Sequence, residues 1–272
     1  ERATYLYVET EEDLVLVLVD RYEKVAYGDV VEVTGTLTKP ENFETDLGRT
    51  FNYRGYLKAK GIEYKISFAQ VKTLSQGNGN KLISYLFIFK SAFMNRLEAS
   101  ISEPAAGLGE GLLLGVKQAL GEDLEAAFRK TGIIHIVVLS GYNIMLVVIF
   151  IMYVLGFFLR KKLRVFAGIL SIAAFAILVG LSATVVRASI MAALLLIVQA
   201  TKRTYLVLRG LMLAGLIMIL INPFLLVYDV GFQLSFLATL GLILISPHLE
   251  NLFVKVPSLF GTRSFLVATI ST

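Results

Sequence analysis

The polar residues that interrupt long apolar runs are those in this sequence that could do chemistry. The uncharged run 131–159 contains His135 and, near its middle, the patch Ser-Gly-Tyr-Asn at 140–143. Arg187 and Asp229 lie at the outer ends of two later apolar runs, immediately before 188–201 and 230–248. A guanidinium inside a membrane costs roughly 2.5–3.5 kcal/mol on insertion scales, so polar side chains at that depth mark candidate sites. Such side chains are expected to face protein or water rather than lipid.

Two readings compete for the charged pair. Arg187 and Asp229 are expected at similar depth, so one interpretation is an ion pair between them. Such a pair could serve function or only hold the helices together. Alternatively, the side chain of Arg187 reaches the outer headgroups. Asp229 is followed by Gln233 and Ser235, so one helix carries a carboxylate, an amide and a hydroxyl.

Catalysis by these residues is not expected. His135, Ser140 and Asp229 are the residue types of a serine hydrolase triad. At about 100° per residue, however, His135 and Ser140 lie about 140° apart on one helix, which is against a triad. With two histidines and no cysteine, a conventional zinc site is disfavoured as well. We therefore expect no enzyme, no metal and no cofactor in this chain.

The elements that hold these residues are membrane helices. Hydrophobic residues make up 56% of the 272 positions and charged residues 17%, far from the roughly 25% charged residues of a soluble domain. The run 131–159 is roughly 40 Å long as a helix, more than the ~30 Å hydrocarbon core needs. With it, the uncharged runs predict five spans and a truncated sixth at 264–272; the others are 165–186, 188–201, 210–228 and 230–248.

The basic residues orient these spans. They gather in the loops 160–164, 202–209 and 255–263, whereas the loops 181–184 and 222–228 carry none. Lys and Arg mark cytoplasmic loops, so the residues before the first span belong outside the cytoplasm. Because the chain starts without a signal-like segment and ends inside an apolar run, we expect a fragment of a longer protein.

Residues 1–75 predict a small extracytoplasmic β domain. Strands are expected at 14–19, 30–37 and 64–74, the last with a bulge near Ala69, and a short helix at 51–60 ends at Gly61. A barrel of the OB type fits this pattern, and a sandwich fragment fits nearly as well. A basic and aromatic cluster is the candidate nucleic-acid surface, with solvated charges between core aromatics as the alternative. It comprises Arg49, Tyr53, Arg54, Tyr56 and Lys58.

Residues 76–132 form the second predicted unit, and 133–272 the multi-pass membrane domain. The linker 75–80, Ser-Gln-Gly-Asn-Gly-Asn, has nothing to bury. The segment 81–101 predicts an amphipathic helix that lies in the membrane interface or packs on the β domain. A shorter amphipathic helix is expected at 122–130.

Several blocks resemble the ComEC family of competence membrane proteins. The segment 128–141, FRKTGIIHIVVLSG, is similar to that family's F-R-x-T-G-x-x-H-L-L-A-I-S-G, and 111–116 to the preceding LLLG segment. Residues 186–191, VRASIM, resemble its R-A-x-x-M segment. Asn222-Pro223 with 229–236, DVGFQLSF, resembles its last block, and Gly28-Asp29 with 51–57 resembles its OB-like domain.

The resemblance implies a channel that passes single-stranded DNA into the cytoplasm in natural transformation. It places the chain in the bacterial cytoplasmic membrane with the β domain outside. The implied partners are single-stranded DNA, the lipid bilayer, DNA-receptor and helicase components of a competence machinery and, where one chain does not close the pore, a second copy. The translocation path would include His135, Ser140, Gly141, Asn143, Arg187, Asp229, Gln233 and Ser235.

Two departures limit what the resemblance implies. The family usually has Leu-His after Ser-Gly, where this chain has Tyr142 and Asn143, so a role for that second histidine does not carry over. The metallo-β-lactamase-like domain common in the family is not matched here. Two rival hypotheses are a secondary transporter of a small solute, with 140–143 as a broken-helix site, and the membrane scaffold of a hydrolase.

Overall fold

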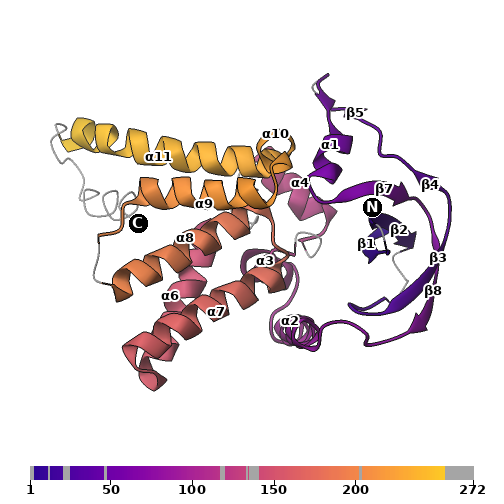
Figure 1. Ribbon diagram of the computed structural model, residues 1–272, viewed down its shortest axis with the longest axis horizontal. Coiled ribbons are helices and arrows are strands. Elements are labelled where there is room, and N and C mark those ends of the chain that lie inside the picture. The colour runs from indigo at the N-terminus through magenta and orange to yellow at the C-terminus, as the bar shows by residue number, and fades with distance from the viewer. Residues whose placement is uncertain are drawn as a thin grey trace.

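The computed structural model describes residues 3–11, 13–20, 25–45, 48–116, 120–132, 134, 141–201 and 204–254. It consists of a β-rich N-terminal region on one side and a body of long helices on the other (Figure 1). The fold is therefore mostly helical with a small N-terminal sheet region.

The strands form three ladders. Their bounds are β1 Ala3–Glu9, β2 Leu14–Asp20, β3 Val30–Thr34, β4 Leu37–Thr38, β5 Phe43–Glu44, β6 Thr50–Phe51, β7 Ile62–Ile66 and β8 Gln70–Ser75. One sheet has the order β1-β2-β7-β4, in which β1 and β2 are antiparallel and β2 and β7 are parallel; β3 pairs with β8, and β5 with β6. The β-rich domain is as expected, and its closure into an OB-type barrel stays a prediction.

The central strand β2 is buried on both faces, which explains its unbroken apolar run. Val15, Val17 and Val19 pack with Ile66 and Ala69 on one face. Leu16 packs with Leu57 and Ile62 on the other. A strand covered on both faces gains nothing from alternating polar residues.

The prediction of one bulged strand over 64–74 is wrong. The segment forms two strands, β7 and β8, which belong to different ladders. Between them Phe68 takes a left-handed backbone conformation, with φ of 53°, and its side chain is 85% exposed. The phase slip in the apolar pattern therefore marks a change of sheet.

The helices α1, α2 and α4 lie close to the ranges predicted from the sequence. Helix α1, Tyr53–Lys58, begins after Asn52, whose side-chain oxygen accepts a hydrogen bond from the Gly55 N–H at 2.8 Å. Gly61 follows with φ of 76°, as a glycine past a helix end does. Helices α2 Lys81–Ser100 and α4 Glu122–Lys130 match their expected ranges, and α3 is Ala105–Leu114.

The segment 75–80 is more than a spacer. The Asn78 N–H donates to the Gly28 carbonyl at 2.8 Å, and a Cβ on Gly79 would lie 2.8 Å from the Gly28 Cα. Beyond it, α2 packs on α3 and on the helical body, and Phe87 contacts Tyr27 of the β domain with ring centroids 5.4 Å apart. A place for α2 in the membrane interface stays a prediction.

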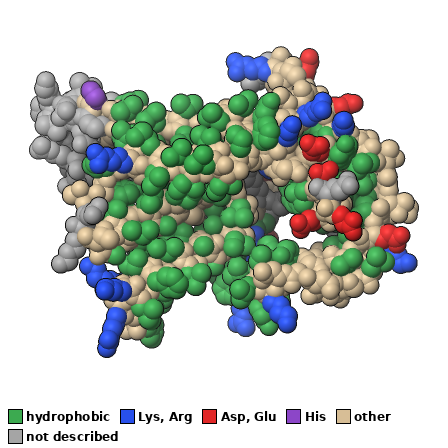
Figure 2. Space-filling model, viewed as in Figure 1, with side chains coloured by type: hydrophobic (Ala, Val, Ile, Leu, Met, Phe, Trp, Pro, Cys, Tyr) green, Lys and Arg blue, Asp and Glu red, His purple; other side chains and the backbone are tan. Residues whose placement is uncertain are grey.

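The helical body comprises α6 Gly141–Phe158, α7 Lys161–Val179, α8 Ala183–Ala200, α9 Val207–Ile221, α10 Phe224–Tyr228 and α11 Val230–Val254. Its core lies between α6, α7 and α8, where Ile144, Val148, Ile172, Val185 and Leu196 are buried. Within the described ranges, α7 and α8 are long and apolar enough to cross a membrane, and the other apolar segments are shorter, at 105–114, 143–158, 207–221 and 230–246. Apolar side chains also cover much of the outer surface of the helices (Figure 2).

Two predicted span boundaries are wrong. The chain turns at Gly180 and Leu181, with φ of 99° and 48°, so α8 begins at residue 183 instead of 188. Arg187 is thus the fifth residue of α8. The expected span 210–228 is divided into α9 and α10 at Asn222 and Pro223, because proline cannot donate the backbone hydrogen bond that would continue the helix.

Candidate functional site

The guanidinium of Arg187 is buried inside the helical body. Its side chain is 8% exposed, and Nη1 donates a hydrogen bond to Oγ1 of Thr239 on α11. The Thr239 hydroxyl in turn donates to the Ser235 carbonyl at 2.9 Å. The Phe236 ring centroid lies 5.9 Å from the Arg187 Cζ. Burial excludes the interpretation in which Arg187 extends over the surface to lipid headgroups.

The first turn of α6 approaches the same guanidinium. A Cβ on Gly141 would lie 3.5 Å from Nη2 of Arg187 and 3.8 Å from the Ala188 Cβ, so glycine permits this approach. The guanidinium of Arg187 therefore lies beside the first described turn of α6.

This place has spare hydrogen-bond donors. Arg187 forms no ion pair within the described part of the chain, and its Nε has no hydrogen-bond partner. The buried Ser235 hydroxyl, one turn before Thr239 on α11, also lacks a partner. Donors without acceptors fit an anion, whose oxygens would satisfy them.

Asp229 is not the partner of Arg187. It is the N-cap of α11, since its Oδ1 accepts a hydrogen bond from the Phe232 N–H at 2.7 Å. Gln233 completes the turn, because its Nε2 donates to the carbonyls of Leu226 and Val227 at 2.9 and 3.1 Å. These two candidate residues thus hold the α10–α11 corner together.

The other predicted path residues are separated. Asn143 on α6 donates from Nδ2 to the Leu112 carbonyl of α3 at 3.3 Å, which ties α6 to the glycine-rich segment. His135 and Ser140 lie outside the described residues. The structure thus brings Gly141, Arg187 and Ser235 into one region, whereas Asn143 contacts α3 and Asp229 and Gln233 cap helices.

A second candidate site lies where the β domain meets the helical body. Tyr228 of α10 packs against the backbone of α1, and a Cβ on Gly55 would lie 2.2 Å from its Cδ1. The Asn222 side chain donates to the Ala59 carbonyl at 2.6 Å. Lys58 Nζ lies 5.0 Å from the Phe224 ring centroid. We call this contact between α1 and the 222–228 segment the junction.

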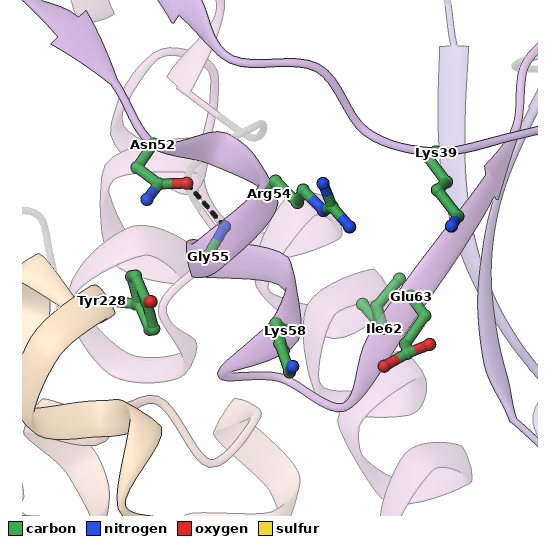
Figure 3. A pocket seen from close by; sticks show the side chains of 8 residues that line it. All are labelled: Lys39, Asn52, Arg54, Gly55, Lys58, Ile62, Glu63 and Tyr228. Atoms are coloured by element: carbon green, nitrogen blue, oxygen red, sulfur yellow. Dashed lines mark hydrogen bonds between the residues drawn. The ribbon is translucent and has the colours of Figure 1, made fainter.

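The junction borders a pocket of about 250 Å³ (Figure 3). Figure 3 shows Arg54, Lys39, Lys58 and Glu63 around one space. The lining residues are Lys39, Asn52, Arg54, Gly55, Lys58, Ile62, Glu63 and Tyr228. The pocket therefore presents three cations and one carboxylate, so its charge is positive.

The predicted DNA-binding cluster is divided by this geometry. Arg54 and Lys58 line the pocket, whereas the Tyr53 and Tyr56 rings stack on each other, with centroids 6.4 Å apart, and pack on the core around Leu57. Arg49 lies in the loop before β6, where its carbonyl accepts hydrogen bonds from Thr45. The cluster is thus part core and part pocket wall.

Two side chains in this cluster have shifted pKa values. Burial raises the pKa of the Tyr53 phenol, and the nearby phenols of Tyr5 and Tyr7 raise it further. Burial also acts on Lys60 and lowers its pKa, but the hydrogen bond to Tyr56 and nearby phenols outweigh it, so the net pKa is raised. Both groups therefore keep their protons more firmly in the folded domain.

Several residues at these sites are not among the predicted site residues: Thr239 and Phe236 at the first, and Lys39, Asn52, Glu63 and Tyr228 at the pocket. Thr239 lies four positions after Ser235, a helical spacing that could have added it. Outside both sites, Glu110 on α3 is 2% exposed and one of its carboxyl oxygens has no hydrogen-bond partner. Among the described residues no group of three or more His, Cys, Asp or Glu could hold a metal ion.

Comparison with known proteins assigns the family. The sequence model of the family described as "Competence protein" matches residues 112–272. ComE operon protein 3 of Bacillus subtilis (strain 168) is 25% identical over 233 residues, which cover 85% of this chain and 29% of that protein. The chain thus spans under a third of that relative's length. No solved structure matches. Since the family match covers more than half of the chain, the chain belongs to the competence protein family, ComEC, as its motifs predict.

Proposed function

We propose that this chain forms part of a membrane channel that passes single-stranded DNA into the cytoplasm. Membership of the competence protein family supports a role in competence and DNA uptake. The observation that carries the channel proposal is the buried guanidinium of Arg187, whose Nε has no hydrogen-bond partner and whose Nη2 lies beside Gly141 of α6.

A polyanion needs a buried positive group to cross an apolar layer. Each phosphate carries one negative charge, and moving it away from water is expensive unless fixed positive groups replace the hydration. Arg187 supplies one such group. Asp229, the one carboxylate expected within the spans, has an oxygen engaged by the α11 N–H of Phe232. The site thus favours a passing phosphate without binding it permanently.

The rest of the proposal concerns sidedness and partners. The β domain lies outside the cytoplasm and meets the strand first, while the apolar helices face the bilayer. Single-stranded DNA is the substrate, and no catalytic step is assigned to this part of the protein. A receptor, a helicase and a second copy of the chain are the remaining partners to test.

The test is import of labelled DNA into the cytoplasm of cells that carry the full-length gene, its deletion, or Arg187→Gln. Arg209→Gln is the matched control, because Arg209 is exposed on α9. The proposal expects that deletion leaves DNA bound outside and that Arg187→Gln reduces import at normal membrane abundance. Unchanged import after deletion, in a strain that takes up DNA, would refute it and favour a small-solute transporter.

A further inference from the structure

We infer that the pocket at the junction binds one phosphodiester group of the incoming strand. This inference rests on the proposed function and names the place where the β domain delivers the strand to the helical body. The pocket volume of about 250 Å³ lies just below the roughly 300–1,000 Å³ of sites for drug-sized ligands. It therefore has room for one phosphodiester group.

The cations of the pocket are available to a ligand. Lys39, Arg54 and Lys58 form no ion pair with Glu63 or with any other described residue. Lys39 and Lys58 instead lie over aromatic rings, 5.9 Å from the Tyr64 centroid and 5.0 Å from the Phe224 centroid. Such contacts position an ammonium group and leave its N–H donors exposed.

The remaining polar groups of the pocket also favour a phosphate. The oxygen of the Asn52 side chain is engaged by the Gly55 N–H, which leaves the amide nitrogen as a donor. The wall thus offers the donors of one amide, one guanidinium and two ammonium groups. A planar guanidinium matches two phosphate oxygens at once.

A stacked base is a poorer fit than a phosphate. The one aromatic ring in the lining, Tyr228, has its ring packed against the Gly55 backbone. Stacking platforms for single strands need rings whose faces are open to successive bases. The Tyr53 and Tyr56 rings are occupied by each other. The pocket therefore recognises charge and not sequence.

The charges around the pocket are mixed, and those beside the hollow are mainly acidic. Figure 2 shows Lys and Arg side chains interspersed with Asp and Glu at the α1 end of the β domain, and further Asp and Glu side chains beside the hollow between the β domain and the helices. Carboxylates repel a phosphate, so the hollow is the less favourable path for the first contact.

The experiment measures binding of fluorescent dT12 to the full-length protein in nanodiscs of phosphatidylcholine, which has no net charge, over a range of salt concentrations. The double variant Arg54→Gln/Lys58→Gln removes two pocket cations. Arg96→Gln/Lys72→Gln removes the same two residue types at exposed positions on α2 and β8. The slope of log K against log salt falls by about 0.7 for each single-strand phosphate contact that is lost.

We expect the pocket variant to lower this slope by about 0.7 and the control variant to leave it unchanged. Glu63→Gln removes a repulsive charge and should strengthen binding. An unchanged slope in the pocket variant, or an equal fall in both variants, overturns the inference. A pocket variant that binds dT12 normally but no longer binds added vesicles of phosphatidylglycerol also overturns the inference. That result assigns the pocket to a lipid phosphate.

Failure of this inference is separable from failure of the channel proposal. DNA import is measured in cells that carry the same pocket variant. If import requires the gene but the pocket variant imports and binds DNA normally, the channel proposal stands and the phosphate pocket is refuted. If import does not require the gene, the channel proposal fails whatever the pocket binds in vitro.

Discussion

Replacing Arg187 by methionine should make the helical body more stable while it stops DNA import. Methionine is unbranched and fills a long, narrow space without a charge. The Thr239 hydroxyl would keep its own hydrogen bond to the Ser235 carbonyl, so the change leaves that hydroxyl with a partner. Stability and function are therefore expected to change in opposite directions at this residue.

The magnitude follows from the contacts of Arg187. Burying the guanidinium costs about 2.5–3.5 kcal/mol, and its unpartnered Nε about 1–3 kcal/mol more. The hydrogen bond to Thr239 returns about 1.5–3 kcal/mol, and the contact with Phe236 about 0.5–2 kcal/mol. The costs exceed the gains by about 1–2 kcal/mol, which is the expected stabilisation.

The assay is unfolding of the purified full-length protein by dodecyl sulfate in mixed micelles, with DNA import measured in parallel. Arg209→Met is the control, since this exposed residue should change stability by less than about 0.5 kcal/mol. Thr239→Val leaves the guanidinium without its acceptor and should destabilise by about 1.5–3 kcal/mol. A destabilisation by Arg187→Met of about 1 kcal/mol or more would refute the reasoning and make Arg187 a structural residue.

Three further perturbations test the geometry. Gly55→Ala should lower the unfolding temperature, because its Cβ would lie 2.2 Å from the Tyr228 ring, and the additional change Tyr228→Ala should restore part of the loss; an unchanged temperature contradicts this packing. Asp229→Ala should cost about 1 kcal/mol as a lost N-cap, whereas Asp229→Asn keeps an accepting oxygen and most of the stability; equal losses would show that the charge matters. The pKa values of Tyr53 and Lys60 are raised on folding, so their contribution is full below about pH 10 and declines as pH rises through the folded values. Unfolding followed by circular dichroism at pH 9 and 11 should show this decline, and a smaller one in Tyr53→Phe/Lys60→Gln.

Much of the local structure could be predicted from the sequence, and two of its errors share one backbone feature. The apolar run of β2, the short helix α1 with Gly61 after it, and the ranges of α2 and α4 all follow from local patterns. The two misplaced turns contain Phe68 and Leu181, large residues with positive φ. Large residues rarely adopt the left-handed region, so their sequence does not predict a turn there.

The residues Arg187 and Asp229 could be identified from the sequence, but their hydrogen-bond partners could not. Arg187 is identified by its charge in an apolar run, but its partner Thr239 lies 52 positions later on another helix. Asp229 follows a proline-started helix and precedes an apolar one, which is also the signal of an N-cap. Local capping prevailed over the long-range ion pair because the Phe232 N–H lies only three residues away.

Among the described residues, the β domain contacts helices at two places far apart in the sequence. One is the hydrogen bond from Asn222 to the Ala59 carbonyl, and the other is the contact of Tyr27 with Phe87. One contact joins the β domain to the last third of the chain and the other to the helix that follows it directly, so the β domain packs against helices from both ends of the helical part of the chain.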